Sequence, residues 1–269
     1  TLSNYINSSS PNNGQFNAIT TSSGMTASIA GSALQFVRTS GTGSFSRTTN
    51  FSPIPSGIIY KFDLNVSASS QTGLVARWQV GDGFSTNNSN ESSNDCYAQF
   101  AIDFRSGNNY RINDITNGNT SSNFSGGTIR TITWVLNNSG ITLSYNAPDG
   151  TVKTVSNNRT DLWVGNTRVI TGDNVEDNGN ISDMKFVFSN GTGTVIMDNI
   201  LITQYIPVIT TQPSSTPSVC AGSSVTFTAA ASGLPTPTVK WQKNISSVWT
   251  DISGATSNSY TISSPVVAD

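Results

Sequence analysis

Apolar and polar residues alternate with a period of two through most of the chain. Within residues 60–66, tyrosine, phenylalanine, leucine and valine are separated by lysine, aspartate and asparagine. The same alternation recurs at 74–80, 98–104, 129–135 and 141–145. Successive side chains of a strand point to opposite faces of its sheet, so this period predicts strands with one buried face and one polar face. The longer period of an amphipathic helix is almost absent.

Turn signals separate the alternating runs. Residues 137–140 (Asn-Asn-Ser-Gly) and 147–150 (Ala-Pro-Asp-Gly) supply the residue types that adopt the positive φ of tight hairpin turns. We therefore expect strands near 128–136, 139–146 and 150–156 to form a meander. The longer polar stretches at 84–95 and 172–180 are expected to be loops.

The number and spacing of the runs indicate the fold class. Roughly a dozen short strands with frequent turns favour an all-β, two-sheet antiparallel sandwich of the jelly-roll (concanavalin-like) type over a closed barrel. Residues 194–203 form the most hydrophobic run of the chain, and Tyr205-Ile206-Pro207 follows it. We take that run as the closing strand and expect the first domain to span residues 1–205.

After residue 207 the composition changes, with four prolines between 213 and 237 and a new alternating run from 223. Gln212-Pro213 and the segments Val-Cys-Ala-Gly-Ser (219–223), Val-Lys-Trp-Gln-Lys (239–243) and Ile-Ser-Gly-Ala-Thr (252–256) resemble immunoglobulin-like repeats of large secreted proteins of the Bacteroidetes type. The resemblance implies a smaller β-sandwich over residues 206–269, with Trp241 packed in its core. Because the family pattern continues beyond this point, we expect the second domain to be truncated and the parent protein to carry further domains.

The two cysteines, Cys96 and Cys220, fall in different predicted domains. A bridge between them would have to cross from one domain to the other. In the immunoglobulin-like family, the cysteine before the second strand pairs with one near the domain end, and that partner is missing here. The resemblance therefore implies that Cys220 is unpaired.

Charge and histidine content exclude several classes of function. The 269 residues include 13 basic and 15 acidic side chains and no histidine. Without histidine the chain has neither a Ser-His-Asp or Cys-His triad nor an imidazole-ligated zinc site. Its net charge of −2 offers no attraction to phosphate backbones, so we expect no nucleic-acid partner.

The overall composition indicates where the protein works. Serine, threonine and asparagine make up roughly two fifths of the chain, which gives a surface of hydroxyls and amides in place of charges. No apolar run approaches the ~18 residues of a membrane span, so we expect no membrane insertion. Together these features indicate a secreted or cell-surface protein.

Paired carboxylates are the one kind of catalytic equipment that this composition leaves open. Glycoside hydrolysis needs an acid and a base or nucleophile on opposite sides of a sugar. Asp63 and Asp103 occupy polar positions of strands that could line one sheet, while Tyr110, Arg111 and Arg77 would allow a lyase. Because acidic residues at such positions are usually solvated, we assign no catalytic residue.

Calcium is the metal that this chain could bind, because aspartate and asparagine supply its oxygen ligands. Residues 171–180 look most like a ligand loop, with Asp173 and Asp177 among its acidic side chains. Independently, the segment Met-Asp-Asn-Ile-Leu-Ile (197–202) resembles the closing strand of jelly-roll carbohydrate-binding modules. That resemblance implies that Asp198 helps to hold a structural Ca²⁺ against the N-terminal segment. The alternative role of Asp198 is to cap backbone amides.

Polar side chains on two consecutive strands are the candidates for ligand contacts: Arg77 and Gln79 on one, and Gln99, Asp103 and Arg105 on the next. Jelly-roll modules present a polar sheet face or its edge loops to a glycan, where arginines and amides bind hydroxyls and aromatic rings stack on sugars.

The tryptophans of the first domain separate into two groups. Trp78 and Trp134 share the phase of apolar neighbours, which predicts core positions. Trp163 lies close to the polar turn at 157–160 and is the candidate stacking platform for a sugar.

Together these features favour a non-catalytic carbohydrate-binding module of a large secreted or cell-surface bacterial protein, with a polysaccharide or cell-surface glycan as its partner. An adhesin or stalk segment without a small ligand is the first alternative. A polysaccharide lyase or glycoside hydrolase on the same sandwich is the second.

Overall fold

The computed structural model describes residues 1–12, 14–68, 73–176, 179–205, 208–214, 220, 222–232, 237–263 and 265. Regular structure in these residues consists of strands and one short 3-10 helix, η1 (Leu2–Tyr5), so the predicted all-β fold class is confirmed. The chain divides into two compact units, Thr1–Gln204 and Tyr205–Asp269. In the part of the chain that the structure describes, no helix has the length and apolar character needed to span a membrane.

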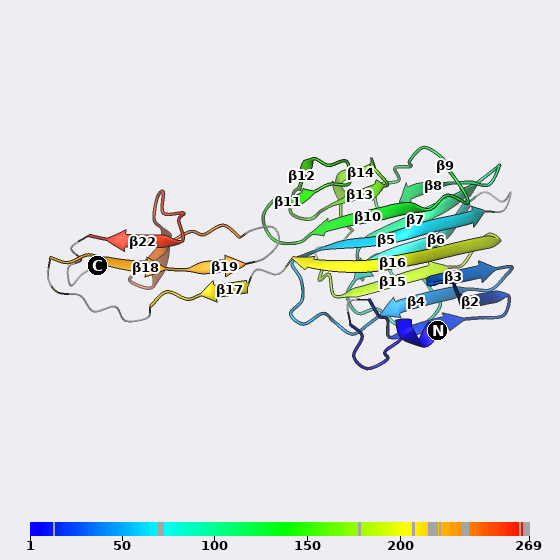
Figure 1. The fold of residues 1–269 in the computed structure, drawn as a ribbon, viewed down its shortest axis with the longest axis horizontal. Coiled ribbons are helices and arrows are strands. Elements are labelled where there is room, and N and C mark those ends of the chain that lie inside the picture. Colours follow the sequence, from blue (N-terminus) through cyan, green and yellow to red (C-terminus); the bar gives the residue numbers. More distant parts are fainter. Residues whose placement is uncertain are drawn as a thin grey trace. The chain divides into compact units, whose positions relative to one another are not determined.

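Two seven-stranded sheets build the first unit (Figure 1). Sheet I has the order β1 (Ala18–Thr21), β4 (Gly43–Arg47), β15 (Asp183–Phe188), β6 (Gly73–Gly81), β7 (Cys96–Arg105), β8 (Asn109–Asp114) and β9 (Phe124–Ser125). Sheet II has the order β14 (Thr167–Asn174), β13 (Arg159–Val164), β10 (Arg130–Asn137), β5 (Gly57–Ala68), β16 (Gly193–Tyr205), β3 (Ala33–Arg38) and β2 (Met25–Ala30). The chain crosses repeatedly between the sheets, as the predicted jelly-roll sandwich requires.

Aromatic rings from both sheets meet in the core of the first unit. The ring of Trp78 in sheet I stacks on Phe100 of β7 with centroids 5.0 Å apart, and on Phe62 of sheet II at 5.5 Å. Trp134 of sheet II approaches Phe100 edge-on at 4.9 Å. Trp78 and Trp134 are both fully buried, which confirms their predicted core positions. These contacts fix which side chains of each strand face outward.

The meander predicted for residues 128–156 is only partly right. β11 (Leu143–Asn146) and β12 (Val152–Val155) form the expected hairpin, but β10 pairs with β13 and β5 instead of β11. The hairpin folds over the outer side of sheet II, where Leu143 and Val155 are buried. It does so because the outward side chains Val135 and Trp163 make this part of the sheet apolar, and the hairpin has an apolar face of its own to bury.

In the second unit, three two-stranded pairs are described: β17 (Val208–Thr211) with β19 (Ala230–Ser232), β18 (Val225–Thr228) with β22 (Ser259–Ile262), and β20 (Gln242–Ile245) with β21 (Val248–Asp251). Trp241 lies near Phe227 and Tyr260, with ring centroids 6.3 and 6.1 Å away, and is half-buried. Cys220 is an exposed free thiol, and Cys96 is a buried free thiol in the first unit.

Candidate functional site

The outer face of sheet I carries the polar side chains that were predicted to contact a ligand. Strand pairing sets Gln79 of β6 opposite Gln99 of β7, with Arg77 in the next outward row of β6. Further along β7, Asp103 lies opposite Arg111 of β8. The predicted side chains of β6 and β7 therefore share one face of the sandwich.

Gln79 and Gln99 hold loops onto this face. The Nε2 atom of Gln79 donates to the carbonyl oxygen of Glu91 at 3.2 Å, and its Oε1 accepts the Glu91 backbone N–H at 3.0 Å. The Nε2 atom of Gln99 donates to the Glu176 carboxylate. The two amides are 1% and 3% exposed, because residues 82–95 and the segment after β14 cover them. Neither amide is open to a ligand in this arrangement.

A buried ion pair anchors the same loop. The ammonium group of Lys185, on β15, contacts the Glu91 carboxylate and donates to the carbonyl oxygen of Ser85 at 3.1 Å. Burial raises the pKa of Glu91, but the hydrogen bonds from Lys185 and Ser85 outweigh it and hold the pKa below its ordinary value. Glu91 is therefore a charged anchor of the loop.

Two arginines contact one carboxylate on the open part of this face, and a third arginine stands on the neighbouring strand. The Oδ2 atom of Asp103 accepts a hydrogen bond from Arg111 Nε at 2.7 Å and lies 3.5 Å from Arg105 Nη1. The side chains of Arg105 and Arg111 are 35% and 28% exposed, whereas that of Asp103 is 5% exposed. Arg77 is half-buried and donates to Gln99 at 3.4 Å. We call Arg77, Asp103, Arg105 and Arg111 the arginine face; it sets three positive charges against one negative charge.

Trp163 is buried, which corrects its assignment as a stacking platform. Its side chain is 2% exposed, and its indole N–H donates to the hydroxyl of Tyr145 at 2.9 Å. The Tyr145 hydroxyl in turn donates to Asp161 Oδ2 at 2.5 Å. The β11–β12 hairpin covers the ring. The polar turn that precedes Trp163 in the sequence gives no indication of this cover, so the prediction from that turn was wrong.

Asp161 ties the hairpin and the β13–β14 turn to sheet II. It is fully buried and pairs with Arg168, and it accepts the backbone N–H of Gly172 at 2.6 Å as well as the Tyr145 hydroxyl. Burial raises the pKa of Tyr145, and its hydrogen bond to Asp161 raises it further. Tyr145 therefore stays a neutral donor.

Replacing Tyr145 by phenylalanine should lower the free energy of unfolding by about 1–3 kcal/mol, because a buried N–H of Trp163 and a carboxylate oxygen of Asp161 lose their partner. Urea unfolding measures the change. Tyr5→Phe is the matched control, since its hydroxyl bonds to Ser32 in an exposed setting. Equal effects of the two substitutions would contradict the anchoring role of Tyr145.

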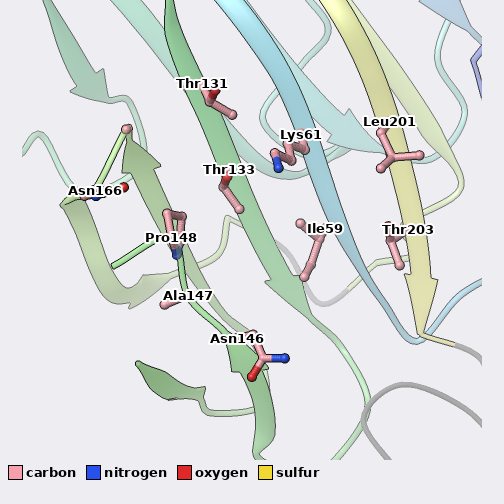
Figure 2. A pocket seen from close by; sticks show the side chains of 11 residues that line it. Ile59, Lys61, Thr131, Thr133, Asn146, Ala147, Pro148, Asn166, Leu201 and Thr203 are labelled. Atoms are coloured by element: carbon pink, nitrogen blue, oxygen red, sulfur yellow. The ribbon is translucent and has the colours of Figure 1, made fainter. Parts of the chain in front are cut away.

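A groove of about 490 Å³ crosses the outer face of sheet II (Figure 2). Strands β5, β10 and β16 form its floor through Ile59, Lys61, Thr131, Thr133, Leu201 and Thr203. Residues 146–148, at the turn of the hairpin, and Asn166, in the β13–β14 turn, lie on the side away from Leu201 and Thr203 (Figure 2). A second hollow of about 300 Å³ shares Lys61, Thr131 and Leu201 with the groove and extends it along β5 and β16.

Asn199 shapes the groove by shifting the phase of β16. Its φ of 51° lies in the left-handed region, which asparagine tolerates better than most residues. Before it, Val195 and Met197 face the core, whereas after it Ile202 does so. Leu201 is thereby turned outward and is 54% exposed.

Asp63 is fixed at the end of the groove. Its Oδ1 accepts the Thr131 hydroxyl at 2.6 Å, and its Oδ2 accepts the Asn199 side-chain amide at 2.8 Å. Lys61 stands two residues earlier on the same side of β5 and is exposed. The groove therefore carries one positive and one negative charge on neighbouring outward positions.

The described acidic residues of the two independent calcium predictions lie in different parts of sheet II. Asp173 on β14 and Asp198 on β16 are four strands apart in sheet II, about 19 Å at the ordinary strand spacing. Asp198 accepts the Ser32 hydroxyl at 2.7 Å and the Asn199 N–H at 2.9 Å, and Asp177 lies outside the described residues. In the described ranges, no three His, Cys, Asp or Glu side chains form a group that could hold a metal.

Asp173 also departs from its predicted setting. Residues 172–174 belong to β14, not to a loop, because they continue the pairing with β13, where Asp173 lies opposite Thr160. The Asp173 carboxylate accepts the side-chain amide of Asn119 at 3.0 Å. A structural calcium ion thus stays a prediction, and a melting temperature that falls on adding chelator would support it.

The carboxylates considered for catalysis lie on opposite sides of the sandwich. Asp63 is on the outward side of β5 in sheet II, and Asp103 is on the outward side of β7 in sheet I. The core separates them, which corrects the expectation that they could line one sheet. Tyr110 faces the core, is fully buried, and has its pKa raised to about 12 by burial. It is therefore not placed to act as the base of a lyase.

Asp183 links the stability of the first unit to pH. It is 1% exposed at the start of β15, and its Oδ2 accepts the N–H of Phe84 at 2.8 Å. Burial, with a smaller contribution from the charge of Asp82, raises its pKa from 3.8 to about 6. A folded-state pKa above the unfolded value means that the native state binds the proton more tightly. The contribution of Asp183 to the free energy of unfolding therefore falls as pH rises from about 4 through about 6.

Replacing Asp183 by asparagine should remove this loss. We expect the stability of Asp183→Asn relative to the wild type to improve by about 2–3 kcal/mol as pH rises from about 4 to about 7. Calorimetric melting at several pH values measures the difference, with the exposed Asp149→Asn as control. A difference that does not change with pH would contradict the raised pKa.

The sequence did not lead us to predict ligand contacts for two parts of the candidate site, Arg111 and the groove. Arg111 belongs to the polar phase of residues 109–114, a signal that could have added it to the arginines of the two preceding strands. The groove had a weaker signal in the apolar run 200–202, because a strand cannot bury three consecutive side chains on one face. The phase shift at Asn199 that decides which of them faces outward is visible only in the structure.

Among solved structures, the chain resembles a sialidase with a TM-score of 0.46 and 10% identity, over 69% of this chain and 16% of that protein. It also resembles the carbohydrate recognition domain of Emp47p with a TM-score of 0.46 and 11% identity, over 72% of this chain and 89% of that domain. Sequence identities this low show a similarity of fold and nothing more.

Sequence comparison provides a relative and a family. Endoglucanase C of Cellulomonas fimi is 46% identical over 56 residues, which are 21% of this chain and 5% of that protein. The chain thus spans about a twentieth of the length of this relative. Residues 206–269 match the family described as Immunoglobulin domain, so the immunoglobulin-like character predicted for this segment is confirmed.

Proposed function

We propose that the first unit is a non-catalytic carbohydrate-binding module that recognises an acidic glycan, such as a uronate- or sulfate-bearing polysaccharide, at the arginine face. The observation that carries the proposal is the group of three partly exposed arginines on one outward face, where Arg105 and Arg111 share the carboxylate of Asp103 and Arg77 contacts only the Gln99 amide. Guanidinium groups bind carboxylate and sulfate oxygens through paired, charge-assisted hydrogen bonds. In a chain with a net charge of −2, this group of arginines is a local feature of one surface.

The predicted ligand residues take different roles in this proposal. Arg77 and Arg105, with Arg111, contact the glycan, because each keeps part of its side chain exposed. Asp103 orients Arg105 and Arg111 from beneath. Gln79 and Gln99 act indirectly, by holding the covering loops in place.

The chemistry of the arginine face favours binding over cleavage. Arginine stays protonated in proteins and does not serve as a general acid or base near neutral pH. The one carboxylate of the face, Asp103, is ion-paired and almost buried. Glycoside hydrolysis uses two carboxylates about 5–10 Å apart, and Asp63 and Asp103 stand on opposite sides of the core.

The second unit supports a role as one module of a longer extracellular polypeptide. Residues 206–269 match the immunoglobulin domain family. The relative with 46% identity over 56 residues bears the name of an endoglucanase, and the chain covers 5% of it. A surface rich in hydroxyls and amides suits a secreted or cell-surface protein of a bacterium.

Affinity electrophoresis of the full chain tests the proposal. Native gels would contain polygalacturonate, alginate or carrageenan, with bovine albumin as a non-binding standard. We expect retarded migration in at least one of these gels, without new reducing ends or unsaturated products in the same polysaccharide solutions. Unchanged migration in all three would favour a stalk segment, and released products would favour an enzyme.

A further inference from the structure

The groove on sheet II differs from the arginine face in its charge. Lys61 and Asp63 are its charged side chains, and they stand two residues apart on β5. Asp63 is already held by Thr131 and Asn199 at 2.6 and 2.8 Å. With one charge of each sign, the groove offers no net attraction to an acidic chain.

Unused polar groups face the groove. Thr133, Thr203, Asn146 and Asn166 line it (Figure 2), and within the described residues their side chains make no hydrogen bond to the rest of the protein. Hydroxyl and amide groups both donate and accept hydrogen bonds, which matches the hydroxyl groups of a sugar.

Aliphatic side chains lie between these polar groups. Leu201 is 54% exposed, and Ile59 and Pro148 line the same groove (Figure 2). An exposed leucine on the floor of a groove gains by covering its apolar surface, and the C–H faces of a sugar ring can provide that cover. The groove thus alternates polar and apolar contacts over a volume of about 490 Å³, which is within the range of small-molecule sites.

The topology of the floor argues against a peptide ligand. Peptides commonly bind sheets by pairing with the free edge of a strand. The floor strands β10 and β5 each have a neighbour on both sides in sheet II, and β16 pairs with β3 through Gly193–Met197. Over β10 and β5, a ligand in the groove therefore meets side chains and not a free strand edge.

We propose that the groove is a second binding site, which takes a neutral oligosaccharide and acts independently of the arginine face. The two sites lie on the outer faces of opposite sheets of the sandwich. A unit with two such sites can hold two glycan chains, one acidic and one neutral, at the same time. This inference goes beyond the proposed function, because it needs no ligand at the arginine face.

Titration calorimetry of the full chain with cellohexaose, xylohexaose and mannohexaose tests this site. We expect the wild type to bind at least one of them with one oligosaccharide per chain. Leu201→Ala should raise the dissociation constant about fivefold or more through lost apolar contact, and adding Asn166→Ala should raise it further. Both positions face solvent or a turn, so melting temperatures should stay close to that of the wild type.

Val152→Ala is the matched control, because Val152 is 68% exposed and lies outside the groove. It should leave the dissociation constant within about twofold of the wild type, as should Arg77→Ala. The inference is overturned if none of the three hexaoses binds, if Leu201→Ala behaves like Val152→Ala, or if Arg77→Ala abolishes binding. If the wild type binds a neutral hexaose but no acidic glycan, the proposed function of the arginine face is overturned and the groove remains a binding site.

Discussion

Replacing Asp161 by alanine is expected to lower the free energy of unfolding of the first unit by about 3 kcal/mol or more. Asp161 is fully buried and accepts hydrogen bonds from Arg168, Tyr145 and the Gly172 N–H. Its removal leaves the Arg168 charge without a partner at a site where the arginine side chain is 21% exposed. It also frees the hairpin that forms one side of the groove.

Two further variants separate these effects. Asp161→Asn keeps an acceptor but loses the charge, so its free energy of unfolding should lie between those of the wild type and Asp161→Ala. Asp149→Ala removes an exposed ion pair with Lys153, which solvent screens, and should change the free energy of unfolding far less than Asp161→Ala does. Urea unfolding followed by tryptophan fluorescence measures all three. Asp161→Ala within ~1 kcal/mol of the wild type would contradict the anchoring role.

The double substitution of Arg77 and Arg105 by alanine is expected to weaken the binding of an acidic oligosaccharide by about 100-fold or more. A hydrogen bond to a charged group is worth about 1.5–3 kcal/mol, so each arginine contributes about 10- to 100-fold. Arg111 is kept, since its 2.7 Å contact holds the nearly buried Asp103. The fold should therefore survive the change.

Charge and geometry can be separated at the arginine face. Arg77→Lys keeps the charge but loses the planar pair of donors, so we expect it to recover only part of the affinity. Arg159→Ala is the control, because Arg159 lies at the start of β13 in sheet II, away from the arginine face. Raising NaCl from about 50 to about 500 mM should weaken wild-type binding several-fold. If neither high salt nor the double substitution changes the dissociation constant, the ligand binds at a place other than the arginine face.

Much of the fold follows from the period-two alternation. The runs at 60–66, 74–80 and 98–104 lie within β5, β6 and β7, and their apolar residues are in the core except for Leu74, which is half-buried. The pattern is informative there because each strand buries one face only. It misled the meander prediction, since alternation says which face of a strand is buried but not which strand it pairs with.

The candidate site was less accessible to sequence reasoning. Alternation correctly put Arg77 and Arg105 on an outward face, but Gln79 and Gln99 lie on the same face and are covered by loops. Which outward residues stay open depends on contacts between residues such as Lys185 and Glu91, which are 94 positions apart in the chain. The burial of Trp163 could not be predicted for the same reason, because the β11–β12 hairpin covers its ring.

The arginine face leads us to propose that the first unit binds an acidic glycan and does not cleave it. Calorimetric titration of the full chain with hexameric galacturonate, alginate and carrageenan oligosaccharides, followed by mass spectrometry of the recovered sugars, tests both halves together. We predict saturable heat with at least one hexamer, suppressed in the Arg77→Ala, Arg105→Ala variant, and recovery of that hexamer at its original mass. Absence of heat with every acidic hexamer, or recovery of shorter or unsaturated products, would contradict the claim.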